Sequence, residues 1–138
     1  MIKLGELRRL NPRQVWADEA RDFTPWLAEN LPRLSEVLGM DLELTDREAA
    51  VGDFSCDLLA KDLGTGHIVI IENQFGPTNH DHLGKLLTYA AGLEAEAIVW
   101  VADKVRDEHR QVLEWLNRHT DASIKFFALA IGVNAIRS

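Results

Sequence analysis

The first part of the chain carries the hydrophobic pattern of an amphipathic helix. From Val15 to about Leu38, apolar residues recur at spacings of three and four. Thr24 is followed by a proline, a combination typical of an N-cap and a first helical position, so we expect a break near Thr24. Gly39 is placed to end the helix.

After Gly39 the pattern changes to shorter apolar or alternating runs with the length of strands. Five such runs occupy residues 41–50, 54–62, 67–74, 97–102 and 123–131. Helical spacing returns over residues 79–92, where Thr78 and Asp81 are expected to form a capping pair, and over residues 105–119. The order α, β, β, β, α, β, α, β predicts an α/β fold with a mixed sheet flanked by helices.

The glycine-containing segment between residues 54–62 and 67–74 predicts a β-hairpin. If residues 64 and 65 form a two-residue loop, Leu63 pairs with Gly66, and Asp57 lies directly opposite Glu72. Opposed residues point to the same face of a sheet with their Cβ atoms roughly 5 Å apart. The hairpin therefore predicts two neighbouring carboxylates.

Two carboxylates at the end of a hydrophobic strand repel each other unless a positive charge lies nearby. Strand alternation puts Gln74 on the same face as Asp57 and Glu72. A set of oxygen ligands without cysteine fits Mg²⁺ or Mn²⁺ better than zinc, and phosphate oxygens can complete the coordination of such ions. The alternative is an ordinary salt bridge to a neighbouring Arg or Lys, or solvated strand ends.

The helix after the hairpin carries a polar stripe formed by Thr78, His82, Lys85 and Tyr89. The other stripe is apolar and comprises Leu83, Leu86, Leu87 and Ala90. If the polar stripe faces the carboxylates, Lys85 contributes a cation near a bound phosphate and Tyr89 a hydrogen bond. The alternative is that this stripe is the solvated side of the helix.

Composition limits the wider interpretation. The 138 residues, 46% of them hydrophobic, are enough for one domain, expected to span residues 1–138. No apolar run approaches the about 18 residues of a membrane span, so a cytoplasmic location is the default expectation. The net charge of −7 opposes a general electrostatic grip on nucleic acid, although Arg8, Arg9 and Arg13 form a basic patch.

Other polar and aromatic residues have simpler interpretations. The sequence NHDH at residues 79–82 favours capping and solvation over metal ligation, and DEHR at residues 107–110 favours a solvated helix face. Four tryptophans fall on apolar stripes or in a buried strand and are expected in the core or an interface: Trp16, Trp26, Trp100 and Trp115. Cys56 has no partner for an internal disulfide.

The chain contains, in order, the acidic residue Asp57, a hairpin, the sequence ENQ at residues 72–74 and a helix with Lys85 and Tyr89 four residues apart. This order of features resembles the PD-(D/E)XK phosphodiesterase superfamily. The segments FTPWLAENL, VGDF, IIENQ, HDHLGKLLTYAAG, VWVA and EHR resemble an uncharacterised bacterial branch of predicted nucleases in it. The similarity covers nearly the whole chain and is most specific from Val51 to Gly92. It implies a restriction-endonuclease-like fold with an αβββαβ core.

The resemblance also implies roles for individual residues. Asp57 and Glu72 correspond to the metal ligands, and Glu48 matches an additional acidic position. Gln74 stands where the superfamily usually has the lysine that orients the attacking water, and Lys85 where a glutamine is often found. A neutral amide cannot act as a cation or a general base. Either Lys85 has taken over from the helix, or the domain binds without cutting.

Two functions are therefore expected as alternatives. The first is a phosphodiesterase that depends on Mg²⁺ or Mn²⁺ and acts on DNA, with Asp57, Glu72, Gln74 and Lys85 in the catalytic site and His82 beside it. The second is an inactive module that keeps the fold and binds nucleic acid or protein. A toxin-like or signalling-nucleotide effector would use the same site. A homodimer, which suits the cutting of two strands, and further domains of a longer protein are additional expectations.

Overall fold

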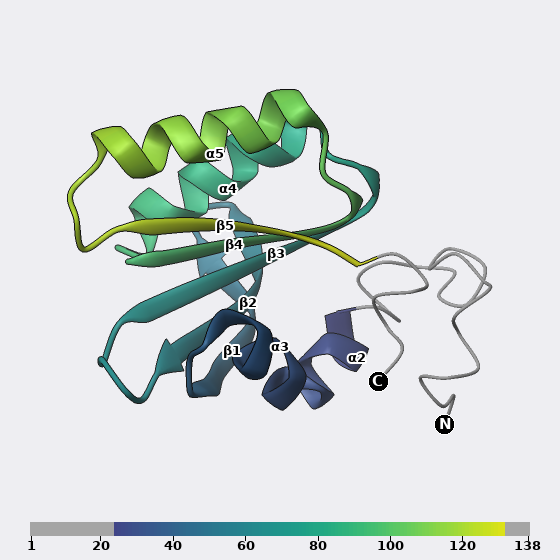
Figure 1. Ribbon diagram of the computed structural model, residues 1–138. Helices are drawn as coiled ribbons and strands as arrows, with labels where there is room; N and C mark the ends of the chain where they lie inside the picture. The colour runs from purple at the N-terminus through teal and green to yellow at the C-terminus, as the bar shows by residue number, and fades with distance from the viewer. Residues whose placement is uncertain (1–23, 132–138) are drawn as a thin grey trace.

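The computed structural model describes residues 24–131, within which five strands form one sheet in the order β1-β2-β3-β4-β5. The strands are β1 (Leu42–Val51), β2 (Phe54–Asp62), β3 (Ile68–Pro77), β4 (Ala97–Lys104) and β5 (Lys125–Ala130). The helices are α2 (Thr24–Glu29), α3 (Leu31–Leu38), α4 (His80–Gly92) and α5 (Asp107–His119). β1, β2 and β3 are antiparallel neighbours, whereas β4 and β5 run parallel to β3. This mixed sheet flanked by helices is the predicted fold class (Figure 1).

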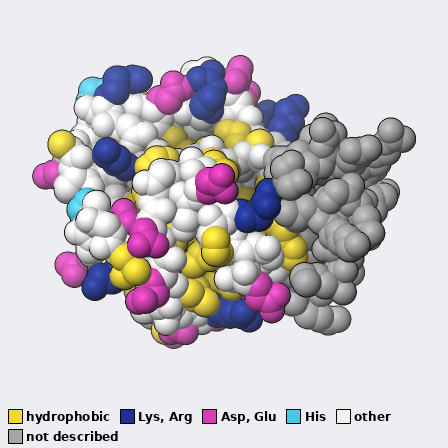
Figure 2. All heavy atoms as spheres, turned by 60° about the horizontal axis from the view of Figure 1, so that its bottom comes forward, with side chains coloured by type: hydrophobic (Ala, Val, Ile, Leu, Met, Phe, Trp, Pro, Cys, Tyr) yellow, Lys and Arg dark blue, Asp and Glu magenta, His cyan; other side chains and the backbone are white. Residues whose placement is uncertain are grey.

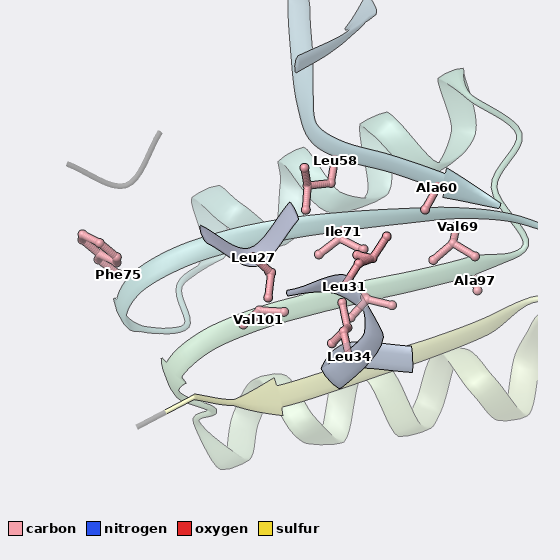
Figure 3. Packing of buried hydrophobic residues seen from close by; sticks show 11 residues of the cluster. Leu27, Leu31, Leu34, Leu58, Ala60, Val69, Ile71, Phe75, Ala97 and Val101 are labelled. Carbon is pink, nitrogen blue, oxygen red and sulfur yellow. The ribbon is translucent and has the colours of Figure 1, made fainter. Parts of the chain in front are cut away.

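Helices cover both faces of the sheet, with α4 and α5 on one side and α2 and α3 on the other (Figure 1). The α2–α3 side buries Leu27, Leu31 and Leu34 against β3 and β4 (Figure 3). The α4–α5 side buries a second cluster that includes Leu86 and Leu113. The central strands are therefore buried on both faces, as their continuous apolar sequences predict.

Two local details differ from the expectation. The helical segment is interrupted at Asn30, between α2 and α3. The β2–β3 loop contains four residues, because the backbone N–H of Asp62 donates to the carbonyl oxygen of His67 at 2.9 Å. The Asp62 carboxylate accepts from the N–H of Gly64 and the hydroxyl of Thr65, each at 3.1 Å, which stabilises the wider loop.

The predicted pairing register is nevertheless correct. β2 and β3 pair from Lys61 opposite Ile68 to Leu58 opposite Ile71, so each pair of residue numbers sums to 129 as expected. A two-residue loop and the observed four-residue loop share the same centre, and widening the loop symmetrically leaves every later pair unchanged. The next position on this register places Asp57 opposite Glu72.

β2 turns sharply next to Leu58, so the far part of the β1–β2 hairpin leaves the plane of the sheet (Figure 3). Beyond the turn, Cys56 packs in the cluster of the α4–α5 side. Val51, near the hairpin tip, lies so close to Gly92 that a Cβ at Gly92 would be 2.5 Å from a Val51 methyl carbon. The absence of a side chain at Gly92 therefore allows the hairpin to close on the end of α4.

The tryptophans differ in burial. Trp100 is fully buried as predicted, whereas Trp115 is 54% exposed and so lies outside the core, which leaves the interface alternative for this residue as a prediction. No helix among residues 24–131 has the length and apolar character needed to cross a bilayer. Several expectations fall outside the described residues, namely the helix from Val15 to residue 23, Trp16 and the basic patch Arg8, Arg9 and Arg13.

Candidate metal and phosphodiester site

Asp57 and Glu72 lie together at the turn in β2. The printed backbone pairing of β2 and β3 ends at Leu58, and side chains continue it. The N–H of Asp57 donates to Glu72 Oε2 at 3.2 Å, and the N–H of Asn73 donates to Asp57 Oδ2 at 2.8 Å. Each carboxylate therefore accepts a backbone hydrogen bond from the other strand. These two bonds hold β2 and β3 together at the turn in β2, where the backbone pairing ends.

Glu48 brings a third acid to the same level of the sheet. Its neighbours Arg47 and Ala49 pair with Leu58 and Cys56, so Glu48 is level with Asp57 on the adjacent strand. Its backbone is left-handed, with φ of 51°. This conformation is uncommon for a residue with a side chain. Ser55 Oγ donates to Glu48 Oε2 at 3.0 Å and holds this carboxylate in place.

The surroundings of Asp57 favour its protonated form. Burial raises its pKa to about 6, the N–H of Asn73 opposes this shift, the charge of Glu48 adds to it, and the charge of Lys85 opposes it. A bound cation would stabilise the ionised form of such a buried carboxyl group in place of the proton. Glu72, only 4% exposed, is the more deeply buried acid.

α4 places Lys85 and Tyr89 beside the acids. Burial lowers the pKa of Lys85, but the hydrogen bond to Asp81 and the charges of Asp81, Tyr89 and Glu72 outweigh it and leave the pKa above its ordinary value. The Lys85 ammonium lies 3.3 Å from the Asp81 carboxylate. Burial raises the pKa of Tyr89, and the negative charges of Glu72 and Asp57 act in the same direction. Lys85 is therefore a cation and Tyr89 a neutral phenol at pH 7.

The predicted division of α4 into two stripes holds only in part. Leu86 is buried as expected, but Leu87 is 38% exposed, and Tyr89 is buried in the same cluster as Leu86.

His82 is half-buried and its pKa is lowered by burial and by the charge of Lys85, with Asp81 acting in the opposite direction. His82 therefore remains neutral near pH 7.

Gln74 is not directed at open solvent. It is 2% exposed, its Oε1 accepts from Trp100 Nε1 at 3.1 Å, and its Nε2 donates to the Pro77 carbonyl oxygen at 2.8 Å. The strand positions of Gln74 and Trp100 are consistent with a common face. Their pairing was not visible in the sequence because β3 and β4 are joined through α4.

The start of α4 differs from the predicted cap. Asn79, rather than Thr78, caps the helix, since Asn79 Oδ1 accepts from the N–H of His82 at 2.9 Å. Thr78 is buried, where its hydroxyl accepts from the N–H of Arg106 at 3.0 Å and bonds to His109 Nδ1 at 2.7 Å.

His109 belongs to a solvated face in the sequence-based prediction, but it is 3% exposed, so that prediction is wrong for this residue. Its Nε2 lies 2.9 Å from Nδ1 of His80, so α5 contacts the first residue of α4 as well as Thr78. His109 is spaced four and seven residues before Leu113 and Leu116. That spacing is the signal that could have placed it on the inner side of α5.

The donor set fits a hard cation. No group of three or more His, Cys, Asp or Glu side chains among residues 24–131 is arranged to hold a metal ion. Mg²⁺ needs only one or two protein carboxylates, because water and substrate phosphate supply the rest. Asp57 and Glu72 meet that requirement through oxygen atoms alone. Cys56 is an unsuitable ligand, since burial and the charges of Glu72 and Asp57 raise the pKa of its thiol.

A separate cavity of about 470 Å³ lies on the opposite side of the sheet. Its lining is mainly apolar and includes Trp26, Leu34, Val101, Leu129 and Ile131. None of the carboxylates described above lines this cavity, so the cavity and the carboxylate pair lie on different faces of the sheet. We place the candidate site at the carboxylates, because they supply groups that can bind a cation.

No family model and no curated protein matches the chain. Two solved structures are similar in fold. A repair endonuclease from Pyrococcus abyssi superposes with a TM-score of 0.59 and 15% identity over 76% of this chain and 45% of that chain. A complex of EndoMS with dsDNA gives a TM-score of 0.56 and 22% identity over 75% of this chain and 42% of that chain. The chain thus spans less than half the length of either protein, and what it shares with these nucleases is their mixed α/β fold.

Proposed function

We propose that the protein is a phosphodiesterase that depends on Mg²⁺ or Mn²⁺ and cleaves DNA, as the PD-(D/E)XK resemblance implies. The observation that carries this proposal is the reciprocal hydrogen bonding that brings Asp57 and Glu72 together beside Lys85. Support also comes from the two fold neighbours, of which one is a repair endonuclease and the other was solved with dsDNA.

The residues of this chain would divide the work as follows. Asp57 and Glu72 would hold the ion, which when bound supplies Lewis-acid stabilisation of the phosphate and lowers the pKa of a water molecule. Lys85 would place a positive charge near the attacked phosphate, where it stabilises the developing negative charge. Tyr89, which stays protonated, can donate a hydrogen bond to the same group, and Glu48 strengthens the negative field at Asp57.

Metal-linked thermal melting tests the proposal. The melting temperature should rise with millimolar Mg²⁺ or Mn²⁺, and a concentration of 100 times Kd stabilises the folded state by about 2.7 kcal/mol. Asp57→Asn should abolish this rise. Asp46→Asn, a matched change at an exposed position of β1, should preserve it.

An inactive interaction module is the second candidate. It is favoured by the pairing of Lys85 with Asp81 and by the two internal hydrogen bonds of Gln74, the residue that stands where the superfamily usually has its lysine. Melting that ignores both ions, together with plasmid DNA that stays intact in Mn²⁺, would favour this candidate.

We further propose that the active form is a homodimer and that the chain works with additional domains. Cutting both strands of a duplex is served by two symmetric sites. Sedimentation of the protein with and without duplex DNA measures the stoichiometry. A complex with one protein chain per duplex at saturation would contradict the dimer.

A further inference from the structure

Gln74 spans an irregularity in β3. On the β4 side, Gln74 is level with Ala102 and Pro77 with Lys104, so β3 contains one more residue than β4 between these pairs. The N–H of Gly76, within this bulge, donates to Asp103 Oδ2 at 2.8 Å. The bond from Gln74 Nε2 to the Pro77 carbonyl oxygen connects the two residues that flank this bulge.

The bulge determines where α4 leaves the sheet. α4 begins at His80, three residues after Pro77, and carries Lys85 on its second turn. An extra residue in a strand shifts the face to which every later residue points. The bulge therefore sets the level and rotation of α4, and with them the position of Lys85 relative to Asp57.

Trp100 holds the other end of the Gln74 amide. The indole N–H is buried and donates to Gln74 Oε1 at 3.1 Å, so the amide is fixed to β4 as well as to Pro77 at the end of the bulge. A buried donor or acceptor that loses its partner costs more than an exposed one, which makes this arrangement specific for an amide.

Thr78, which follows Pro77, provides a second and independent connection, which joins the segment between β3 and α4 to β4 and the start of α5. Its N–H donates to the Lys104 carbonyl oxygen at 2.9 Å, and its hydroxyl contacts Arg106 and His109. These bonds do not involve Gln74. A variant at Gln74 should therefore fold while losing only part of what holds α4.

We propose that Gln74 is a positioning residue whose amide bridges the β3 bulge, fixes the start of α4 and thereby holds Lys85 beside Asp57 and Glu72. The part that concerns Lys85 rests on the proposed function. The part that concerns the bulge and α4 stands on the hydrogen bonds alone.

Amide hydrogen exchange tests the placement of α4 without any catalytic readout. Gln74→Met keeps the side-chain length and removes both hydrogen bonds. Exchange at residues 83–85 should become about tenfold faster, the factor expected for the loss of the one bond that holds the strand end next to α4, from Gln74 Nε2 to the Pro77 carbonyl oxygen, while residues 113–116 of α5 are unchanged. Equal acceleration in both helices, or none in α4, would overturn the proposal.

Asn117→Leu is the matched control. Asn117 is an amide of the same kind that bonds to the N–H and carbonyl oxygen of Phe126, at 2.7 and 2.9 Å, and ties α5 to β5. This variant should speed exchange in α5 and leave residues 83–85 unchanged.

Nuclease kinetics test the link to Lys85. Gln74→Met should lower kcat about tenfold with KM for DNA unchanged, and it should cause no further loss in a Lys85→Met background. Gln74→Lys should not raise kcat, because an ammonium cannot accept from Trp100 Nε1. Additive losses or a gain from the lysine would refute the positioning role. If the wild type cleaves nothing with either ion, the proposed function fails, and hydrogen exchange alone decides whether Gln74 places α4.

Discussion

Asp57 is the residue at which stability and the candidate chemistry oppose each other. Its pKa is raised from 3.8 to about 6, mainly by burial, so the folded protein binds the proton more tightly than the unfolded chain does. Stability contributed by this group is therefore greatest at low pH and falls as the pH rises from about 4 to about 6. Above that range the folded state holds a carboxylate at an energetic cost that a bound cation would reduce.

Replacing Asp57 with asparagine should stabilise the metal-free protein at neutral pH. Asparagine stays neutral, and its side-chain oxygen can still accept from the N–H of Asn73. Urea unfolding in EDTA at pH 7.5 should show a gain of about 3 kcal/mol, which is the free-energy equivalent of roughly two pKa units. Near pH 4 the two proteins should be equally stable. A variant that is weaker at pH 7.5 would mean that the Asp57 charge stabilises the fold.

Lys85→Met isolates the contribution of the ammonium. The charge of Lys85 lowers the pKa of Asp57, so its removal should move this pKa above 6. NMR titration of the Asp57 carboxyl carbon measures the shift. DNA cleavage should fall by about 10²- to 10³-fold, as for other charges that stabilise a transition state. Lys61→Met, an exposed lysine change on β2, should alter neither value.

At the scale of elements, the site depends on how the β1–β2 hairpin closes on α4. The hairpin carries Glu48 and Asp57, whereas α4 carries Lys85 and Tyr89. The approach of Val51 to Gly92 fixes the distance between these two elements, because a side chain at Gly92 would overlap Val51.

Gly92→Ala should destabilise the protein although alanine favours a helix. Alanine gains up to about 1 kcal/mol in helix propensity, but overpacking costs typically 1–3 kcal/mol, so the net change in the free energy of unfolding should be a loss. Chemical denaturation measures it. The double variant Val51→Ala with Gly92→Ala should be more stable than Gly92→Ala alone, since the smaller Val51 replacement makes room for the new methyl group. Failure of this rescue would mean that the hairpin does not rest on α4.

At the scale of the whole molecule, electrostatics do not favour tight binding to nucleic acid. The net charge is −7, and Figure 2 shows acidic and basic side chains interspersed on the face that carries α2 and α3. Three of the described basic side chains, Lys85, Arg106 and Arg110, are each paired with an acid. Under the proposed function, DNA binding would therefore draw on the divalent ion more than on a basic surface.

DNA affinity should accordingly depend on the ion and only weakly on salt. With Ca²⁺ as a non-catalytic ion, EDTA should weaken binding at least tenfold, and the slope of log K against log[salt] should stay below about 3 in magnitude. Fluorescence anisotropy with a labelled duplex measures both. A steep salt slope with no effect of EDTA would assign the interaction to Lys and Arg contacts instead.

The sequence by itself determined the strands, the order of elements and the register that pairs residues 57 and 72. These features follow from the periods of apolar residues and from a loop whose centre the glycines define, and both are local properties of the chain. Asp57, Glu72 and Lys85 could therefore be named before any coordinates, together with the fold class.

The tertiary structure alone decided which groups satisfy the buried polar atoms. The partner of Gln74 is Trp100, the partner of Thr78 is His109, and the turn in β2 is held by carboxylates that accept backbone hydrogen bonds. Each contact joins elements brought together by the parallel β3–α4–β4–α5 connection or by the turn in β2. Hydrophobic periodicity reports which side of an element is buried, but it carries no information about which polar group on another element will meet it there.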